Sequence, residues 1–200
     1  MKVHITNIYG QHFSSTALKA QNRTANIAKE SLGYHELGIY CYDAKSDSAE
    51  MLASRLDGII ASVGYGDIVI FQYPTWNDII FDKTLIRRLS QYRGLKKIFF
   101  VHDVLSLMFE SNRYLLKEHI EFFNQADLLI LPSQRMADVL HREGLTVKKT
   151  VIQKMWDFPV AVDKTVVPEF RKAVNFVGNS NLRKFKFIKE WNYDSVELRV

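Results

Sequence analysis

Thiol chemistry is nearly absent from this chain, because Cys41 is its only cysteine. A single cysteine cannot form an internal disulfide and fits a reducing compartment. The N-terminal segment MKVHITN also lacks the apolar stretch of a secretion signal, so we expect a cytoplasmic protein. The longest apolar runs, such as DLLIL at 127–131, fall far short of the ~20 residues that span a bilayer, which predicts no integral membrane association.

Several motifs of common nucleotide-binding and hydrolytic enzymes are missing as well. The nine glycines form neither the G-x-G-x-x-G fingerprint of dinucleotide-binding domains nor the P-loop of ATPases. No serine stands in a G-x-S-x-G nucleophile elbow. No Asp-x-Asp pair is present to hold a metal-bound diphosphate, and the six histidines are scattered. We therefore expect no metal site and no bound cofactor.

What the chain does contain is the composition of an ordinary globular protein, with 47% hydrophobic and 24% charged residues. Its net charge of +5 is compatible with anionic small molecules, a membrane surface or nucleic acid, and does not choose among them. Basic residues crowd between positions 171 and 189, where a solvated helix face is the simplest interpretation. Only Phe185 and Phe187 are interleaved with them, so we expect no nucleic-acid partner.

Short apolar runs alternate with helical patterns along the chain, which predicts an α/β fold with a Rossmann-like parallel sheet and crossover helices. The runs rich in isoleucine, valine and phenylalanine predict six strands, at 2–7, 36–41, 67–73, 97–102, 127–132 and 149–153. The third, fourth and fifth of these are continuously apolar, which predicts central strands covered on both faces.

Helical spacing of apolar residues predicts three of the covering helices. One stripe runs from Leu52 to Val63, and a second runs from Phe81 to Tyr92. A third helix should begin after Ser133 as its N-cap and stop at Gly144. We interpret these stripes as core-facing surfaces rather than as cofactor contacts.

The pattern changes near residue 155, because the following segment holds two of the four prolines and has no clear periodicity. We divide the chain into a Rossmann-like domain at 1–157, a linker at 158–173 and the start of a second α/β unit at 174–200. The second unit repeats the strand-then-glycine pattern in VNFVGNSN. The segments FKFIKEW and VELRV that follow predict a helix and a strand.

The loops beyond the carboxyl ends of the strands are the candidate site, because open parallel sheets bind their ligands there. The first loop carries Gly10 and then a run of hydroxyl side chains up to Thr16. These residues suit an anion at a helix N-terminus or, alternatively, only cap the helix. Trp76 suits stacking on a sugar or, alternatively, burial in the core. His102 and Asp103 offer an imidazole and a carboxylate that could take a proton from an acceptor hydroxyl.

Segments spread over nearly the whole chain resemble one family of enzymes. They are ITNIYGQ, STA, LGYHELGIYCY, RLDGIIA, GDIVIFQYPTWN, HDV, LMF, PSQ, MWDFP and FVGN. Together they closely resemble the cytoplasmic glucosyltransferases that glycosylate serine-rich-repeat adhesins of Gram-positive bacteria, a group often described as similar to β-1,6-galactofuranosyltransferases. The resemblance implies a GT-B fold, in which two Rossmann-like halves face each other across a cleft. This chain would supply the acceptor-side half.

The resemblance also implies the reaction. A hexose would pass from a UDP-sugar, either UDP-glucose or UDP-N-acetylglucosamine, to N-acetylglucosamine (GlcNAc) on a modified serine-rich adhesin. The donor contacts would come from Gly10, Gln11 and Thr16 in the first loop and from Gly178 and Asn179 in the second unit.

On the acceptor side, the resemblance and the position of the loops suggest that Trp76, Asn77 and His102 face the sugar. Asp103 would be the catalytic base, with His102 or Asp157 as alternatives. Most of the family's nucleotide-binding half is absent from this sequence, so we expect the 200-residue chain to fold without transferring sugar by itself. An exposed sheet edge should make it a homo-oligomer. The alternative function is a non-catalytic module that binds glycosylated adhesin or supports a partner transferase.

Overall fold

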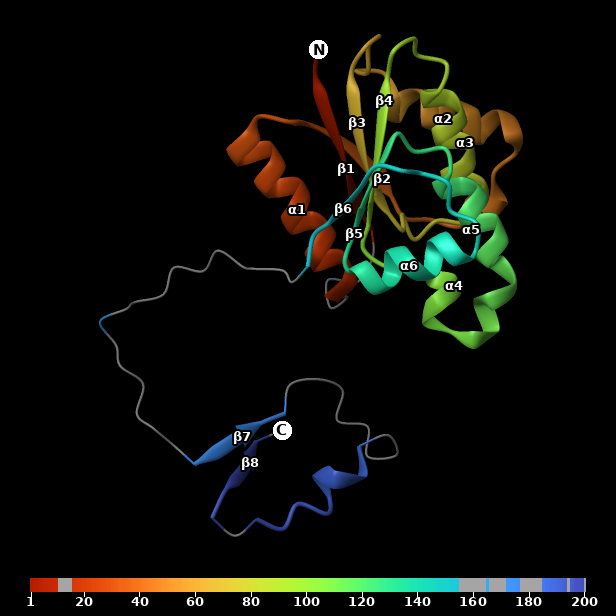
Figure 1. The fold of residues 1–200 in the computed structure, drawn as a ribbon. Coiled ribbons are helices and arrows are strands. Elements are labelled where there is room, and N and C mark those ends of the chain that lie inside the picture. The colour runs from red at the N-terminus through yellow and green to blue at the C-terminus, as the bar shows by residue number, and fades with distance from the viewer. Residues whose placement is uncertain (11–15, 155–164, 166–171, 177–184, 194, 200) are drawn as a thin grey trace. The chain divides into compact units, whose positions relative to one another are not determined.

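The computed structural model describes residues 1–10, 16–154, 165, 172–176, 185–193 and 195–199 (Figure 1). The chain divides into two compact units, Met1–Trp156 and Asp157–Val200. The first unit contains the main sheet and every α-helix of the described residues. None of those helices is both long enough and apolar enough to cross a membrane.

Six parallel strands form the sheet of the first unit, in the order β2-β1-β3-β4-β5-β6 (Figure 1). Each strand lies within two residues of a predicted one, and the predicted α/β fold with a Rossmann-like parallel sheet is confirmed. The continuously apolar strands β3, β4 and β5 lie inside the sheet, as expected. The bounds are β1 Val3–Tyr9, β2 His35–Tyr40, β3 Ile68–Tyr73, β4 Lys96–Val101, β5 Leu128–Leu131 and β6 Thr150–Ile152.

Helices cover both faces of this sheet. Figure 1 shows α1 on one side and α2, α3 and α5 on the other. The α-helices are α1 Thr16–Leu32, α2 Ala49–Ile60, α3 Ile79–Leu89, α4 Leu105–Met108, α5 Leu116–Phe123 and α6 Gln134–Arg142. Two short 3-10 helices, η1 Ala44–Ser46 and η2 Glu110–Leu115, interrupt the connections after β2 and β4.

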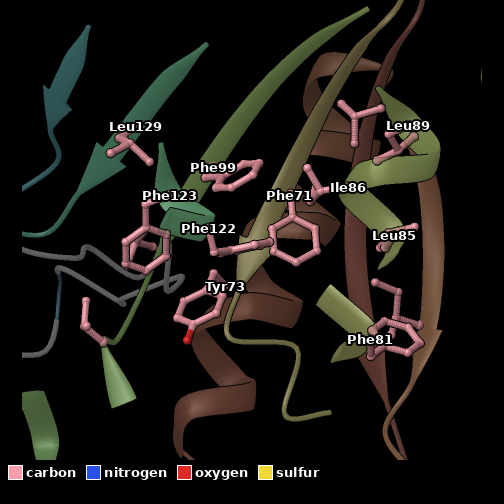
Figure 2. Packing of buried hydrophobic residues seen from close by; sticks show 14 of the residues in the cluster. Phe71, Tyr73, Phe81, Leu85, Ile86, Leu89, Phe99, Phe122, Phe123 and Leu129 are labelled. Atoms are coloured by element: carbon pink, nitrogen blue, oxygen red, sulfur yellow. The ribbon is translucent and has the colours of Figure 1, made fainter. Parts of the chain in front are cut away.

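Most of the core lies on the side of α2, α3 and α5. Figure 2 shows the rings of Phe71, Phe99 and Phe122 meeting there, with centroids 5.3 Å apart for Phe71 and Phe99 and 4.9 Å apart for Phe99 and Phe122. Complete burial of each such ring stabilises the fold by about 1.5 to 3 kcal/mol. The core-facing interpretation of the two apolar stripes is confirmed, because most of their members are buried: Leu52, Leu56, Ile60, Val63, Phe81, Leu85, Ile86 and Leu89.

Three helices begin where a side chain caps them. Ser48, Asp78 and Ser133 each accept a hydrogen bond from the backbone N–H three residues further on. Each cap satisfies one of the donors that the first turn of a helix leaves without an intrahelical partner. The predicted start of a helix after Ser133 is thereby confirmed, and the chain leaves this helix through Gly144, whose φ is +108°.

One carboxylate closes the amino end of the sheet. Asp67 accepts hydrogen bonds from the backbone N–H of Lys2 at 2.7 Å and of Gly64 at 2.9 Å, and it lies 3.0 Å from His4 Nε2. These hydrogen bonds hold the pKa of Asp67 well below its usual range, and the bond from Lys2 contributes the most. The turn also needs Gly66, whose φ of +74° lies in the left-handed region.

The second unit contains a parallel strand pair, β7 Ala173–Asn175 and β8 Glu197–Arg199. Between them the described residues include one 3-10 turn, η3 Lys186–Ile188, so the α-helix predicted over FKFIKEW is wrong. Phe185 and Phe187 both contact the ring of Phe176, with centroids 5.2 and 5.6 Å away. Residues two apart do not share a face of an α-helix, which explains the difference. The predicted linker at 158–173 lies almost entirely outside the described residues.

Candidate functional site

The strand order determines which loops are the best placed to hold a ligand. From β1 the chain runs to β2 at one edge, and it then crosses back to β3 on the other side of β1. The carboxyl ends of β1 and β3 therefore flank a topological switch point, where open α/β sheets bind ligands. The loop after β4 lies next to it, because β4 pairs with β3.

The first loop leaves β1 through Gly10. Its φ is +86°, and a Cβ placed there would lie 3.1 Å from Cδ1 of Tyr40, so glycine is required for two separate reasons. Thr16 is the first residue of α1. The other predicted donor contacts lie outside the described residues, and so does one alternative base: Gln11, Gly178, Asn179 and Asp157. Donor binding by these residues stays a prediction.

Trp76 occupies a strained position in the loop after β3. Its φ of 63° is unusual for a residue other than glycine. The indole Nε1 donates a hydrogen bond to Oε1 of Gln21 at 3.2 Å, while Nε2 of Gln21 donates to the carbonyl of Pro74 at 2.7 Å. The ring is partly buried against the main cluster, and its remaining surface is accessible. Gln21 of α1 thus holds both the backbone and the indole of this loop in place.

The side chain of Asn77 is used to join two loops. Its Oδ1 accepts a hydrogen bond from the backbone N–H of Tyr42 at 2.9 Å, and its Nδ2 donates to the carbonyl of Tyr40 at 3.4 Å. Cys41 adds a third link, from its Sγ to the carbonyl of Trp76 at 3.2 Å. The segment 40–42 after β2 is therefore fixed to the loop that presents the indole.

A fully buried carboxyl group supports the loop after β3, which carries Trp76 and Asn77. Asp82 of α3 accepts a hydrogen bond from Oγ1 of Thr75 at 2.6 Å, and Oγ1 of Thr75 accepts one from the backbone N–H of Asn77 at 3.3 Å. Burial raises the pKa of Asp82 to about 8. Sequence reasoning missed this residue, because an acidic side chain in the first turn of a helix is ordinarily exposed.

His102 is held in one protonation state and one tautomer. Nε2 of Gln72 donates to the carbonyls of Thr6 at 2.6 Å and Gln21 at 3.0 Å, so Oε1 of Gln72 is the acceptor that faces His102 Nε2 at 2.9 Å. His102 must then carry its proton on Nε2, which leaves a lone pair on Nδ1. Burial lowers the pKa of His102 to about 4, so the ring is neutral at pH 7.

These contacts bring two of the predicted residues into one network. Gln21 binds Trp76 with its side chain and Gln72 with its backbone carbonyl, and Gln72 binds His102. Asp103 follows directly, half-buried, and burial raises its pKa. Neither glutamine was singled out from the sequence. The signal for Gln72 was present, since it is the only polar residue in the strand IVIFQY.

The polar groups described at this edge of the sheet are mostly amides. Among the described residues no group of three histidine, cysteine, aspartate or glutamate side chains is arranged to hold one. The groups that do gather here are amides, one neutral imidazole and one carboxylate. The amides and the imidazole already form hydrogen bonds within the protein, which hold the loops in place.

Comparison with known proteins gives the family. Residues 2–155 match the model of the glucosyltransferase 3-like N-terminal domain. The chain is 47% identical to glucosyltransferase 3 of Streptococcus parasanguinis over 204 aligned residues, and 49% identical to glucosyltransferase 3 of Streptococcus gordonii over 193. These alignments cover 100% and 96% of this chain but 59% and 56% of the relatives, so the chain spans less than two thirds of their length. With a match of this extent, the chain belongs to the glucosyltransferase 3-like family.

Proposed function

We propose that this chain is the acceptor-side part of a glycosyltransferase that moves a hexose from a UDP-sugar to a saccharide already attached to a polypeptide. The observation that carries the proposal is the family match over residues 2–155, which span the sheet and the network from Trp76 to His102. The proposed donor is UDP-glucose or UDP-N-acetylglucosamine. The proposed acceptor is GlcNAc on a serine-rich adhesin, and the proposed architecture is GT-B.

In the proposed reaction, a hydroxyl oxygen of the acceptor sugar attacks C1 of the donor hexose. The new O–C1 bond forms while the bond from C1 to the UDP oxygen breaks, and the hydroxyl proton passes to Asp103. A half-buried carboxyl group with a raised pKa suits that task, since a general base works best when its pKa approaches the working pH. His102 is neutral and its Nδ1 is buried, so its proposed role is to position Asp103, the next residue of the chain.

The leaving UDP needs positive charge, and helix N-termini can supply it without a metal. In the proposed complex α1, which begins at Thr16 beyond the carboxyl end of β1, directs its N-terminus at the diphosphate. Gly10 and Gln11 would complete this side of the donor site, while Gly178 and Asn179 would contribute from the second unit. A chelator should therefore leave transfer unchanged.

A second candidate is a module that binds glycosylated adhesin, or a partner transferase, without catalysis. The observation behind it is the network from Trp76 to His102, which suits a binding surface whether or not transfer takes place. In either case we expect a homo-oligomer, because β2 is a free edge of the sheet in the described structure. The cytoplasm is the proposed location, in keeping with the single cysteine of the sequence, Cys41.

One experiment separates these candidates. The chain would be tested alone and as a chimera in which the remaining C-terminal part of the Streptococcus gordonii relative follows residue 200. Each protein would be incubated with a GlcNAc-bearing serine peptide and each UDP-sugar in turn, and the product would be weighed by mass spectrometry. We expect the chimera to add one hexose, with and without EDTA. Binding of the peptide without any gain in mass would favour the non-catalytic module, and loss of activity in EDTA that manganese restores would refute metal independence.

A further inference from the structure

A pocket of about 730 Å³ opens beside β2, outside the network just described. Its volume lies within the range of about 300 to 1,000 Å³ that is typical of small-molecule sites. Tyr40, Tyr42 and Arg55 stand around it, and two glycines, Gly38 and Gly58, also line it. No predicted site residue is among the lining residues.

Among the described residues, nothing in the backbone or the packing requires residue 58 to be glycine. Gly58 lies within α2, where glycine costs about 1 kcal/mol relative to alanine. A Cβ placed on it would have no described atom within 4 Å, and its φ is not positive. A Cβ on Gly38 would make only ordinary contact with the ring of Tyr9, at 3.4 Å. This contact places the Cβ position of Gly38 on the face of β2 that Tyr9 covers, so Gly58 is the glycine that carries the argument for the pocket.

The polar wall of the pocket is fixed before any ligand arrives. Asp47 has a side chain only 3% exposed, and its Oδ2 accepts from the hydroxyl of Tyr42 at 2.6 Å and lies 2.9 Å from Nε of Arg55. The guanidinium carbon of Arg55 also lies 5.1 Å from the centroid of the Tyr42 ring. Burial, with the hydrogen bond to Asp47, raises the pKa of Tyr42 to about 12, so its hydroxyl keeps its proton.

This arrangement combines fixed donors and acceptors with aromatic surface and little net charge. Arg55 is neutralised by Asp47, which makes the pocket a poor match for a diphosphate. Its guanidinium has donors beyond Nε, which suit neutral hydroxyl oxygens. The ring of Tyr42, which also contacts Phe81 edge to face, offers an apolar surface. Flat apolar faces beside hydrogen-bonding groups are the complement of a sugar ring.

We infer that this pocket binds a pyranose ring of the acceptor glycan, with Tyr42 against its apolar face and Arg55 donating to its hydroxyl groups. The inference rests on the proposed function, because it identifies part of the acceptor's binding surface. Asn77 connects the two places: it holds the backbone of Tyr42 and belongs to the same loop as Trp76. A glycan seated in the pocket would therefore lie against the segment that supports the candidate site.

The test is an NMR titration of the full 200-residue chain, labelled with ¹⁵N, with the methyl β-glycoside of GlcNAc. We expect saturable shifts of the amide signals of Gly38, Tyr40, Tyr42 and Gly58. The G58F variant should abolish these shifts, because its ring would occupy the pocket. Its thermal unfolding temperature should be no lower than that of the parent chain, since glycine is the weaker helix former.

A second pair of variants separates the pocket from general surface effects. R55M should weaken binding about tenfold, which corresponds to one lost charge-assisted hydrogen bond. R88M removes an arginine of α3 that pairs with Asp57 of α2, and it should leave the dissociation constant unchanged. Equal weakening by both variants would overturn the assignment.

The remaining outcomes are equally decisive. Shifts with an unglycosylated serine peptide, but none with the glycoside, would make the pocket a polypeptide site and overturn the inference. Shifts with UDP alone at the same amides would overturn it in favour of a nucleotide site. Glycoside shifts confined to Trp76 and His102 would also overturn it, yet would leave the proposed function intact. Pocket shifts with an inactive chimera would support the inference and count against the transferase.

Discussion

Two buried aspartates at opposite ends of one sheet have opposite electrostatic environments. At the amino end, Asp67 receives hydrogen bonds from two backbone N–H groups and lies beside His4, and its pKa is held far below the usual range. At the carboxyl end, Asp82 receives one hydroxyl hydrogen bond, and burial raises its pKa to about 8. At the amino end, these contacts compensate the negative charge of Asp67. The carboxyl end instead holds groups whose pKa is shifted by burial toward the uncharged form, as at many functional sites.

The largest expected effect concerns Asp103, which should matter for transfer if the carboxyl end is the functional one. We expect Asp103→Asn, in the chimera with the Streptococcus gordonii relative, to lower kcat about 100- to 10,000-fold, because the base that takes the acceptor proton is lost. Initial rates at saturating acceptor, measured by release of UDP, would test this. Thermal unfolding would show whether the variant remains folded.

The same substitution at the other end of the sheet is the matched control. Asp127 precedes β5 at the amino end, where it accepts a hydrogen bond from the backbone N–H of Lys97 at 2.8 Å. Asp127→Asn should leave kcat unchanged. Near-normal transfer by Asp103→Asn would remove that residue as the base and leave His102 or Asp157. Equal losses in both variants would mean that the two ends do not differ in function.

The next effect is on stability and depends on pH. Asp82 is protonated up to about pH 8 in the folded chain, whereas an unfolded aspartate ionises near pH 3.9. Between these values the folded state binds one more proton, so stability falls as pH rises, by up to about 1.4 kcal/mol per unit. The Asp82→Asn variant has no ionisable group at this position, so its stability should not show this fall with pH. Urea unfolding at pH 5 and pH 7 should show the variant gaining up to about 3 kcal/mol relative to the parent; a constant difference would refute the raised pKa.

Asp67 should behave in the opposite way. Its pKa is lowered on folding, so its contribution to stability is present above about pH 4 and is lost as pH falls through the folded value. Asp67→Asn replaces an acceptor oxygen by a donor facing other donors, and Tm should fall by a few degrees at pH 7. Below pH 4 the difference from the parent should shrink. Asp138→Asn, on the exposed face of α6, serves as control, and a similar fall there would contradict the special role of Asp67.

The fold could be predicted because its signals are local. Continuous apolar runs gave β3, β4 and β5, and the spacing of leucine and isoleucine residues gave α2 and α3. The rule that ligands bind at carboxyl ends then identified the loops with Gly10, Trp76 and His102 without any knowledge of distances. A helix was wrongly predicted at FKFIKEW, where alternate rings meet Phe176 instead.

The support of the candidate site could not be predicted, because its contacts connect distant parts of the chain. Gln72 reaches Thr6, 66 residues away, and Gln21, 51 residues away. Asp82 resembles any acidic residue of a first helical turn until the loop above it is placed. The tautomer of His102 depends in turn on the orientation of Gln72. Each of these contacts depends on the order of the strands in the sheet. Patterns of neighbouring residues in the sequence do not predict that order.

The smallest effects are expected at two glycines. The backbone conformation requires glycine at residue 66 and does not require it at residue 58. Gly66, in the turn at the amino end, has φ +74°, so Gly66→Ala should destabilise the chain by about 1 to 2 kcal/mol. Gly58 has neither a positive φ nor a described neighbour within 4 Å of an added Cβ, so Gly58→Ala should stabilise it by about 0.5 to 1 kcal/mol. Urea unfolding of both variants without ligand would test the pair. A loss of stability in Gly58→Ala would show that packing requires this glycine, and the case for a ligand beside it would lose its first argument.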